Sequence, residues 1–364
     1  MKLSLITFLV FLVGCTNTQE KEYYQPLNNN IQMVIQPIDL IETPDSLQRF
    51  NATHTDLMDT IITFAGYAYT QEDFDTKLSY ITNELERIHN LFTTFEQVHG
   101  VNNLWYVNQN AGITPVVVSP DIIKLLQHGI EAYHLTSGML NIAMGSVLDI
   151  WHRERISQTP YVPTIEELQI AKSHVNINDI IIDEELSTVF ITNPNMTIEV
   201  GAIAKGMAIE NVIEIAQNIG LEHFLISIGG DVRLLSSPPE TDNWSVGVQN
   251  PSNPNDRSIL LDIIRAENMA VFTSGNYQRF FVVNGNKYHH IIDPTTLFPA
   301  NLYKSITVIH ENSIIAEVLT TALYMISIED GKNLLDKLGG YALWITTDNQ
   351  FIASEGYSHF SDNF

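Results

Sequence analysis

The chain has 364 residues, and its 42 acidic and 18 basic side chains give a net charge of -24 at pH 7. That charge repels the phosphates of nucleic acid and excludes a general polybasic face for anionic lipid. A hydrophobic fraction of 45% in a chain of this length suffices for one large domain, or two ordinary ones, with a buried core. Cys15 is the only cysteine, so an intramolecular disulfide is excluded and a zinc site would need His and carboxylates.

The beginning of the chain has the pattern of an export signal. Lys2 gives a positive start, and Leu3 to Val13 form an apolar run that is too short to span a bilayer as a helix. The run ends in Leu-Val-Gly-Cys, which resembles the bacterial lipobox, where the mature chain starts at a cysteine that carries a diacylglyceryl group. We therefore predict a lipoprotein signal peptide over 1–15 and an exported protein anchored through Cys15 to the bacterial membrane, on its outer or periplasmic face. A chance cysteine in an apolar N-terminal helix is the alternative.

The rest of the chain divides into a linker and a body. Residues 16–51 are polar and interrupted by prolines, which is typical of a flexible tether. Residues 52–364 are expected to form the functional body, as one domain or as two subdomains. Apolar periodicity predicts helices over 74–92, 121–135, 164–173 and 313–326. Beta-rich runs predict a hairpin-like pair around 179–191 and single strands over 61–69, 116–118, 244–249, 270–274, 279–283, 305–310 and 342–346.

The segment 197–235 concentrates the features of a ligand site. Its β-branched start, Thr197–Val200, predicts a buried strand, and the amphipathic helix after it has Gly220 at the position of a left-handed C-cap. A second strand and a Gly-Gly-Asp turn at 229–231 complete a predicted β-α-β unit. Its first turn directs free backbone N–H groups and Lys205 at one spot, which is the geometry of an anion site. Glycines that serve helix packing alone are the alternative, and the spacing around Lys205 excludes a Walker A loop.

Residues outside that segment are candidates for metal binding and proton transfer. Glu317 and Thr321 are four apart on a predicted helix, so both can contribute oxygens to a hard cation. A solvated helix face or a local hydrogen bond is the alternative. His290 is a candidate proton acceptor for an attacking hydroxyl, and His289 would face the other way on a strand. A structural hydrogen bond is the alternative role of His290. The commonest hydrolase motifs, Gly-x-Ser-x-Gly and His-Glu-x-x-His, are absent from the sequence.

Several short blocks, in order along the chain, together resemble the ApbE family of FAD:protein FMN transferases. The similarity runs from Met58 to about Ile326. The best matches are Gly-Ala-Ile-Ala-Lys-Gly at 201–206 and Gly-Gly-Asp at 229–231. Further blocks lie at 58–60, 93–95, 107–112, 140–151, 273–277 and 290–294. The resemblance implies an α+β fold with mixed or antiparallel sheets and packed helices, in the T-fold-like architecture of the family.

The resemblance also implies the residues of a site. Lys205 and His290 are expected to act in catalysis. The family has Asp at the position of Glu317, and magnesium tolerates little distortion of its ligands, so a change in metal affinity or preference is expected. The family also has Arg-Thr-Gly where this chain has Thr-Thr-Leu at 295–297. The resemblance implies a magnesium site formed by Glu317, Thr321 and the backbone carbonyl of Ala202. The residues that it implies for flavin or adenine contacts are Met58, Phe95, Leu140, Asn141, Glu199, Lys205, His290 and Ile291.

The activity that the resemblance implies is transfer of the FMN moiety of FAD to a threonine hydroxyl of an acceptor protein, with release of AMP and dependence on Mg²⁺. FAD is thus the expected substrate, and Mg²⁺ the expected cofactor. Acceptors in the family include membrane-bound redox subunits that face outside, which fits an enzyme with a lipid anchor. Metal-dependent hydrolysis of FAD to FMN and AMP, and a flavin-binding lipoprotein without turnover, are the alternatives.

Overall fold

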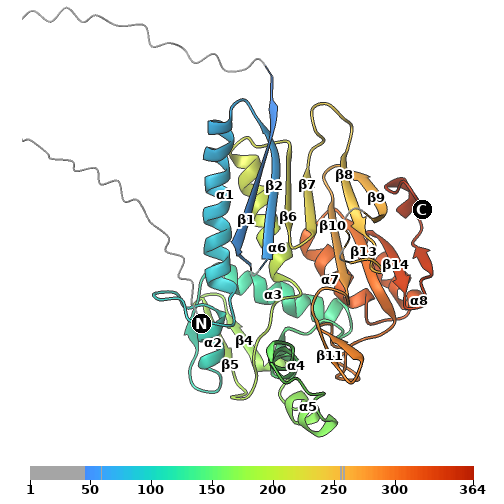
Figure 1. Cartoon of the computed structure of the whole chain (residues 1–364). Helices are drawn as coiled ribbons and strands as arrows, with labels where there is room; N and C mark the ends of the chain where they lie inside the picture. The colour runs from blue at the N-terminus through green and yellow to red at the C-terminus, as the bar shows by residue number, and fades with distance from the viewer. Residues whose placement is uncertain (1–45, 59, 255, 257–258) are drawn as a thin grey trace, which may run out of the picture. The chain divides into compact units, whose positions relative to one another are not determined.

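An eight-stranded antiparallel sheet forms the centre of the fold (Figure 1). The coordinates are a computed structural model that describes residues 46–58, 60–254, 256 and 259–364. The strand order is β1-β2-β6-β7-β10-β13-β14-β15, so the chain returns to this sheet throughout its length. The strands are β1 (Gln48–Leu57), β2 (Thr60–Ala68), β6 (Phe224–Ile228), β7 (Asp231–Leu235), β10 (Ala270–Gly275), β13 (Tyr303–His310), β14 (Tyr341–Thr346) and β15 (Phe351–Ala353).

Three helices cover one face of this sheet and enclose the main core. Helix α1 shows why they pack there, because its buried residues, among them Leu78, Ile81 and Leu85, recur at steps of three and four. Thr70 begins α1 as its N-cap and accepts a hydrogen bond from the Asp73 N–H. The three helices are α1 (Gln71–Phe92), α6 (Ala204–Asn218) and α7 (Ser313–Leu323), with α6 against both α1 and α7.

The other face of the sheet is also covered. The hairpin β8 (Trp244–Gln249) and β9 (Leu260–Ala266) forms a second core there with side chains such as Val232 and Leu234. Burial on both faces explains why β7 is buried at all its positions and does not show the alternation of a half-exposed strand.

A third cluster of apolar residues surrounds Trp151. This ring packs on helix α4 (Gly145–Ile156) against the hairpin β11 (Phe280–Val283) and β12 (Asn286–His289), and its Nε1 donates to the Leu297 carbonyl oxygen at 3.0 Å. Leu297 stands where the resemblance places a glycine. Its φ of +66° keeps the left-handed conformation that glycine adopts most easily, although the side chain is buried.

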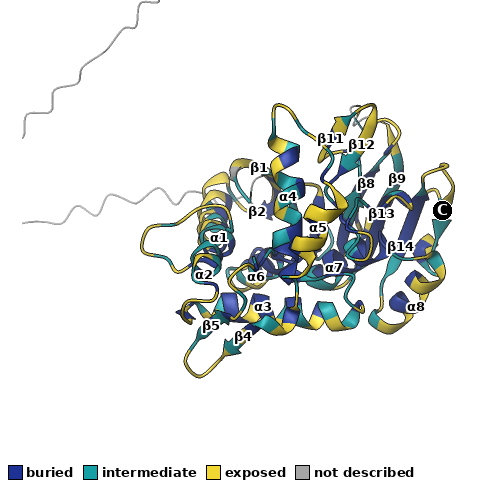
Figure 2. Cartoon of the chain, turned by 90° about the horizontal axis from the view of Figure 1, so that it is seen from below, coloured by how far each residue is buried: buried dark blue, intermediate teal, exposed yellow. Residues whose placement is uncertain are grey.

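The other elements surround these three cores. Figure 2 shows buried dark blue over β13, β14 and α7, and exposed yellow on the outer turns of α3 and α8. Within the described residues, no helix combines the length and apolar character needed to cross a bilayer. The remaining elements are α2 (Leu104–Gln109), β3 (Val116–Val117), α3 (Pro120–Leu135), α5 (Ile165–Lys172), β4 (Ile180–Asp183), β5 (Thr188–Ile191), α8 (Ile328–Leu338) and the short 3-10 turns Ile142–Met144, Ile177–Asp179 and Tyr357–His359.

The predicted strand at Thr197–Val200 is wrong, and with it the β-α-β unit. This segment has no strand neighbour. The side chain of Asn108 takes the place of one: its Oδ1 accepts from the Ile198 N–H at 2.8 Å, and its Nδ2 donates to the Ile198 carbonyl at 3.0 Å. The Gly145 N–H adds a bond to the Thr197 carbonyl at 3.0 Å. Ile198 and Val200 are buried as predicted and Thr197 is half-buried, but side-chain and loop groups satisfy the backbone.

The expected boundary of the tether also changes. Residues Gln48 to Asn51 were expected in the tether, and they belong to β1, which pairs with β2 from Gln48 opposite Ala68. The predicted signal peptide, Cys15 and the tether up to residue 45 lie outside the described residues. The helix C-cap at Gly220 is confirmed, since its φ is +69°.

Candidate active site

A buried ion-pair cluster joins three elements at the N-terminal end of α6. Lys205, in the first turn of α6, donates to Glu317 Oε1 on α7 at 2.7 Å and to Asp231 Oδ2 at the start of β7. Glu317 is 2% exposed and Asp231 is 7% exposed. Their other oxygens are bonded too: Glu317 Oε2 accepts from the Gly206 N–H at 2.7 Å, and Asp231 Oδ1 accepts from the Thr273 N–H at 3.0 Å. Two carboxylates around one ammonium leave this cluster with a net negative charge.

Gly206 allows the close approach of α6 and α7 that makes the cluster. A Cβ at Gly206 would lie 2.6 Å from the Ser313 carbonyl oxygen and 2.8 Å from the Ile314 Cα. These are backbone atoms that cannot move aside without separating the helices. Helix α7 begins at this contact, where the Asn312 side chain accepts from the Ile315 N–H.

Burial shifts the proton affinities within the cluster. Burial raises the pKa of Glu317, and Asp231 raises it further, against the lowering effect of Lys205. For Lys205, burial acts to lower the pKa, but the charges of Asp231 and Glu317 outweigh it and its pKa is raised. Burial, together with Asp231, also raises the pKa of Tyr277 to about 12. The excess negative charge would be relieved by a further cation.

Glu199 connects this cluster with a second group of charged residues. Its Oε1 accepts from the Gly201 N–H at 2.9 Å. The pKa of Glu199 is raised, mainly by burial and further by the charges of Asp149 and Glu317. The Gly201 N–H and Arg279 act in the opposite direction. Glu199 is therefore within electrostatic reach of both Glu317 and Arg279.

His290 follows β12 and lies near two arginines. Its Nδ1 is 3.3 Å from the Arg279 carbonyl oxygen, so the Nδ1–H tautomer donates there and Nε2 is the proton acceptor. Burial lowers the pKa of His290 to about 3, with contributions from the charges of Arg279 and Arg155 and from the neighbouring His289. The imidazole is therefore neutral near pH 7.

His289, in contrast, has a structural role. Its Nδ1 accepts from the Ile291 N–H at 3.2 Å, which leaves Nε2–H to donate to the Ala300 carbonyl at 2.6 Å. The side chain is 6% exposed, and burial lowers its pKa to about 4. The two adjacent histidines thus have different environments, as the expected alternation of a strand predicts.

Phe95 adds an exposed ring to the second charged group. The side chain is 58% exposed, and its centroid lies 5.2 Å from that of the His152 ring. His152 Nδ1 in turn lies 2.7 Å from Arg155 Nη2. The aromatic contact expected at Phe95 is thereby connected to an arginine near His290.

Leu140 and Ile291 are buried rather than open to a ligand. They are 3% and 7% exposed and belong to the main core. Their side chains are committed to packing, so a flavin or adenine contact at these positions would involve the backbone.

Asn141 and Met58 also have partners of their own. Asn141 accepts from the Ala143 N–H at 2.9 Å and donates to the Val175 carbonyl at 3.0 Å. Met58, with φ of +55°, lies between β1 and β2, and its N–H is 3.3 Å from His89 Nδ1. Within the described ranges, no hydrogen bond joins either residue to Lys205 or His290.

The oxygen donors expected for magnesium lie on α7 and directly before α6. Thr321 is one turn beyond Glu317 on α7, and Ala202 is in the turn that leads into α6. Carboxylate, hydroxyl and carbonyl oxygens are the ligands that Mg²⁺ prefers, and the cluster beside them has two carboxylates for one ammonium group. The described residues hold no cluster of three or more His, Cys, Asp or Glu side chains suited to a metal. The donor set fits a hard cation, provided that the Ala202 carbonyl and the Thr321 hydroxyl take part.

Three charged residues of this site were not singled out in the sequence. Asp231 belongs to the matched Gly-Gly-Asp block, so its signal was present. Arg155 and Arg279 lie just beyond the blocks at 140–151 and 273–277, and only the fold brings them near His290 and Glu199.

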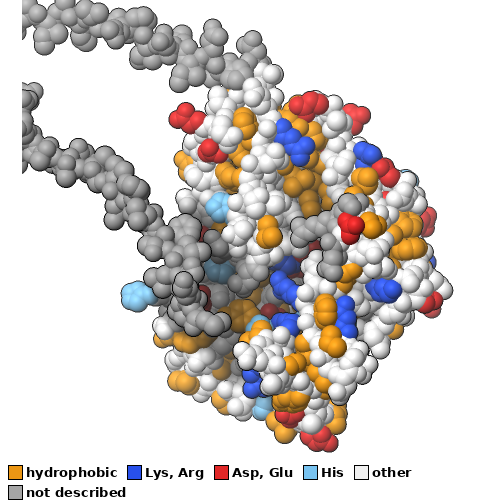
Figure 3. Space-filling model, in the orientation of Figure 1, with side chains coloured by type: hydrophobic (Ala, Val, Ile, Leu, Met, Phe, Trp, Pro, Cys, Tyr) orange, Lys and Arg blue, Asp and Glu red, His pale blue; other side chains and the backbone are white. Residues whose placement is uncertain are grey.

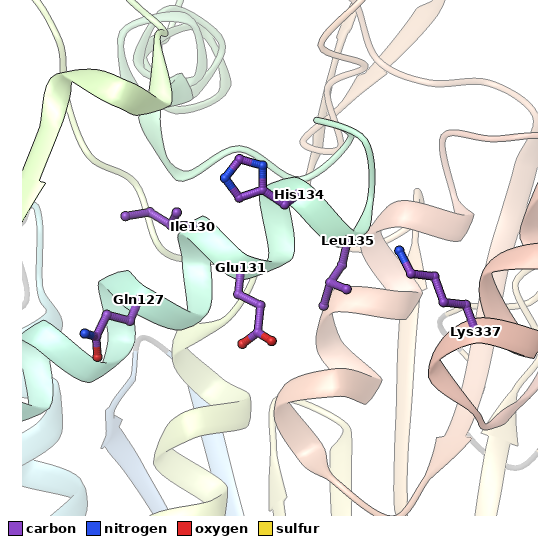
Figure 4. A pocket seen from close by; sticks show the side chains of 6 residues that line it. All are labelled: Gln127, Ile130, Glu131, His134, Leu135 and Lys337. Carbon is purple, nitrogen blue, oxygen red and sulfur yellow. The ribbon is translucent and has the colours of Figure 1, made fainter.

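A separate surface groove lies between α3 and α8, away from these residues. Its volume is about 460 Å³, and Figure 4 shows the side chains that point into it. None of the predicted site residues lines this groove. The lining residues are Gln127, Ile130, Glu131, His134, Leu135 and Lys337.

Solved structures define the class of protein to which this fold belongs. The ApbE protein of Thermotoga maritima superposes with a TM-score of 0.76 at 26% identity, covering 86% of this chain and 99% of that chain. A mutant of the flavin transferase ApbE from Vibrio cholerae superposes with a TM-score of 0.74 at 25% identity, with coverage of 86% and 99%. The expected fold class, α+β with the architecture of ApbE flavin transferases, is therefore confirmed.

The sequence comparisons identify the family itself. The sequence model of the ApbE family matches residues 58–345. The FAD:protein FMN transferase of Haemophilus influenzae is 29% identical over 67% of this chain and 72% of its own length, and that of Vibrio cholerae is 28% identical over 71% and 76%. The chain belongs to the ApbE family, which confirms the expectation from the sequence blocks.

Proposed function

We propose that this protein transfers the FMN moiety of FAD to a threonine hydroxyl of an acceptor protein, with release of AMP. The observation that carries the proposal is the buried Lys205–Asp231–Glu317 cluster at the start of α6, with Glu199 under the electrostatic influence of both Glu317 and Arg279. An oxygen-rich cation site beside positive side chains suits a diphosphate. The FAD:protein FMN transferases among the relatives support the same reaction.

The reaction breaks the phosphoanhydride bond of FAD and forms a phosphoester bond to the threonine oxygen. The threonine oxygen attacks the FMN phosphorus, the new O–P bond forms, and the bond to the bridging oxygen breaks. The bridging oxygen leaves with its electron pair as part of AMP. Neutral His290 is the residue to accept the hydroxyl proton at Nε2, since its Nδ1 is occupied by the Arg279 carbonyl.

Positioning is the other contribution of the chain. Glu317, Thr321 and the carbonyl of Ala202 would hold magnesium, which when bound neutralises charge on the phosphate oxygens. Lys205 is oriented by Asp231 and Glu317 and retains one of its three N–H donors for a diphosphate oxygen. Burial of these groups strengthens their electrostatic effect on a ligand.

The cellular setting is proposed from the sequence. Export and lipidation at Cys15 would hold the enzyme on the outer or periplasmic face of the bacterial membrane. Membrane-bound redox subunits with an exposed threonine are the acceptors that suit this location.

The test is a transfer assay with the full chain, FAD, Mg²⁺ and an acceptor protein, next to the same acceptor with its threonine changed to valine. Flavin fluorescence on the denatured threonine acceptor, with AMP release in equal amount, supports transfer. AMP release without labelling indicates FAD hydrolysis instead. FAD binding without either product would contradict both enzymatic activities.

A further inference from the structure

Two arginines near His290 have no carboxylate partner. Arg87, Arg233 and Arg265 each form an ion pair with an acidic side chain. Arg155 and Arg279 form none with any acidic side chain in the described part of the chain. Arg49, which lies over the Trp244 ring, and the exposed Arg153 form no ion pair with a described acidic side chain either. Arg155 and Arg279 differ from these two because both act on His290.

The two arginines are held by contacts that do not neutralise them. Arg155 Nη2 lies 2.7 Å from His152 Nδ1, and His152 packs against the exposed ring of Phe95. Arg279 lies just before β11, and its carbonyl is the partner of His290 Nδ1. Figure 3 shows Lys and Arg side chains gathered in the lower middle of the face, over α4 and beside β11.

The charges of these residues act on one another. Burial lowers the pKa of Arg155, and Arg279 lowers it further, while Glu199 acts in the opposite direction. The two arginines belong to neighbouring elements, since the Trp151 ring of α4 lies 6.2 Å from the Phe281 ring of β11. An anion bound between the two guanidinium groups would relieve their repulsion in addition to the charge of Glu199. Lys205 has only one N–H donor left for such an anion, because two carboxylates already accept from its ammonium group, so further donors are needed.

A purely structural role explains only part of this arrangement. Arg155 lies in the last turn of α4, where a cation interacts favourably with the helix dipole. Arg153 lies in the same turn and is exposed, so it supplies that interaction equally. The dipole does not account for Arg279, which lies outside the helices.

We infer that Arg155 and Arg279 form the anion subsite for the diphosphate of the nucleotide substrate. The inference rests on the proposed function, because it takes FAD as the ligand. Guanidinium groups present planar pairs of N–H donors that match phosphate oxygens. The exposed Phe95 ring, linked through His152 to Arg155, lies where a flavin or adenine ring attached to that diphosphate can stack.

The test compares FAD with riboflavin, which has the flavin ring but no phosphate. Binding of each to the full chain is measured by flavin fluorescence for wild type, Arg155→Gln, Arg279→Gln and the matched control Arg153→Gln. Each of the first two variants should weaken FAD binding about tenfold or more, because a hydrogen bond between charged partners is lost. Riboflavin binding should change less than about twofold in all variants, and Arg153→Gln should bind FAD as wild type does.

Several results would overturn the inference. One is that Arg155→Gln and Arg279→Gln bind FAD with the affinity of wild type. Another is that both variants lose affinity for FAD and for riboflavin equally, since that indicates general damage to the site. Absence of FAD binding to wild type would overturn it together with the proposed function. If the two arginine variants bind FAD more weakly than wild type but wild type labels no acceptor, the proposed function is wrong and the inference stands. Arg155→Lys, which keeps the charge, checks the fold and should retain part of the affinity.

Discussion

Lys205 on α6 and Glu317 on α7 lie 112 positions apart in the sequence, and an ion pair of 2.7 Å between Nζ and Oε1 joins them in the fold. Glu317 also accepts the Gly206 N–H, so a single carboxylate fixes both the lysine and the start of α6. The glutamate replaces an aspartate expected from the family. Both oxygens of the Glu317 carboxylate are bonded to groups in the first turn of α6.

Replacing Glu317 should affect both folding and metal dependence. Glu317→Ala leaves Lys205 paired with Asp231 but removes the acceptor of the buried Gly206 N–H, which should cost about 1–3 kcal/mol in the free energy of unfolding. It should also abolish Mg²⁺-dependent turnover. Urea unfolding and the transfer assay measure the two effects. Glu214→Ala is the matched control, because Glu214 is an exposed glutamate on α6. Unchanged activity in Glu317→Ala would remove this residue from the site.

Asn108 lies outside the ion-pair cluster, but its side chain should contribute as much to the free energy of unfolding as a residue of that cluster. Asn108→Ala leaves the N–H and the carbonyl of Ile198 without their partners, next to Glu199. A loss of about 1–3 kcal/mol in unfolding free energy is expected for each buried group left unsatisfied. Asn102→Ala, at an exposed amide with one backbone partner, is the control. Equal stability of the two variants would contradict the role assigned to Asn108.

The sequence predicted elements well where one periodic pattern sets both burial and hydrogen bonding. Helix α1 was expected over 74–92 and runs from Gln71 to Phe92, because its apolar stripe has a single buried face. Strand β8 occupies the predicted 244–249. The prediction is wrong at Thr197–Val200, where Ile198 and Val200 are buried but the side chain of Asn108, 90 positions before Ile198, replaces the neighbouring strand.

The candidate site was predicted only in those parts that lie within short motifs. Lys205 and Glu317 were expected to serve ligand and metal separately, and the structure joins them directly. The sequence around Arg155 and Arg279 does not mark them as site residues, because their role depends on how close α4 and β11 lie in the fold. No spacing rule relates a helix end to a strand that begins more than a hundred residues later.

His290 should make stability depend on pH in the acidic range. Its pKa is about 3 in the folded protein against about 6.5 in an unfolded chain. The folded state therefore binds fewer protons, and the stability that neutral His290 contributes is present above about pH 6.5 and lost as the pH falls toward 3. His290→Asn should make the decline of unfolding free energy shallower, by at most about 1.4 kcal/mol per pH unit. Urea titrations at several pH values test this, with the exposed His99→Asn as the control.

The same histidine should give different pH profiles for kcat/KM and kcat. A bound diphosphate opposes the effect of Arg155 and Arg279, so the pKa of His290 should be higher in the enzyme–substrate complex than in the free enzyme. The acidic limb of kcat should therefore lie at higher pH than that of kcat/KM. His290→Gln should lower kcat by about 10²–10⁴-fold if the residue acts as a general base. Profiles that coincide in wild type would argue against His290 as the proton acceptor.

Phe95 should contribute to ligand binding more than to stability. Because 58% of its side chain is exposed, Phe95→Ala should change the unfolding free energy by less than about 0.5 kcal/mol. Loss of a ring that stacks on a base or a flavin typically costs about 1–3 kcal/mol of binding. Fluorescence titration with FAD measures that loss, and Phe95→Tyr, which keeps the ring, should restore most of the affinity. Ile113→Ala is the control, since Ile113 is 72% exposed and belongs to no predicted contact. Unweakened FAD binding by Phe95→Ala would show that the ligand ring lies elsewhere, and the link from Phe95 through His152 to Arg155 would then be one of packing alone.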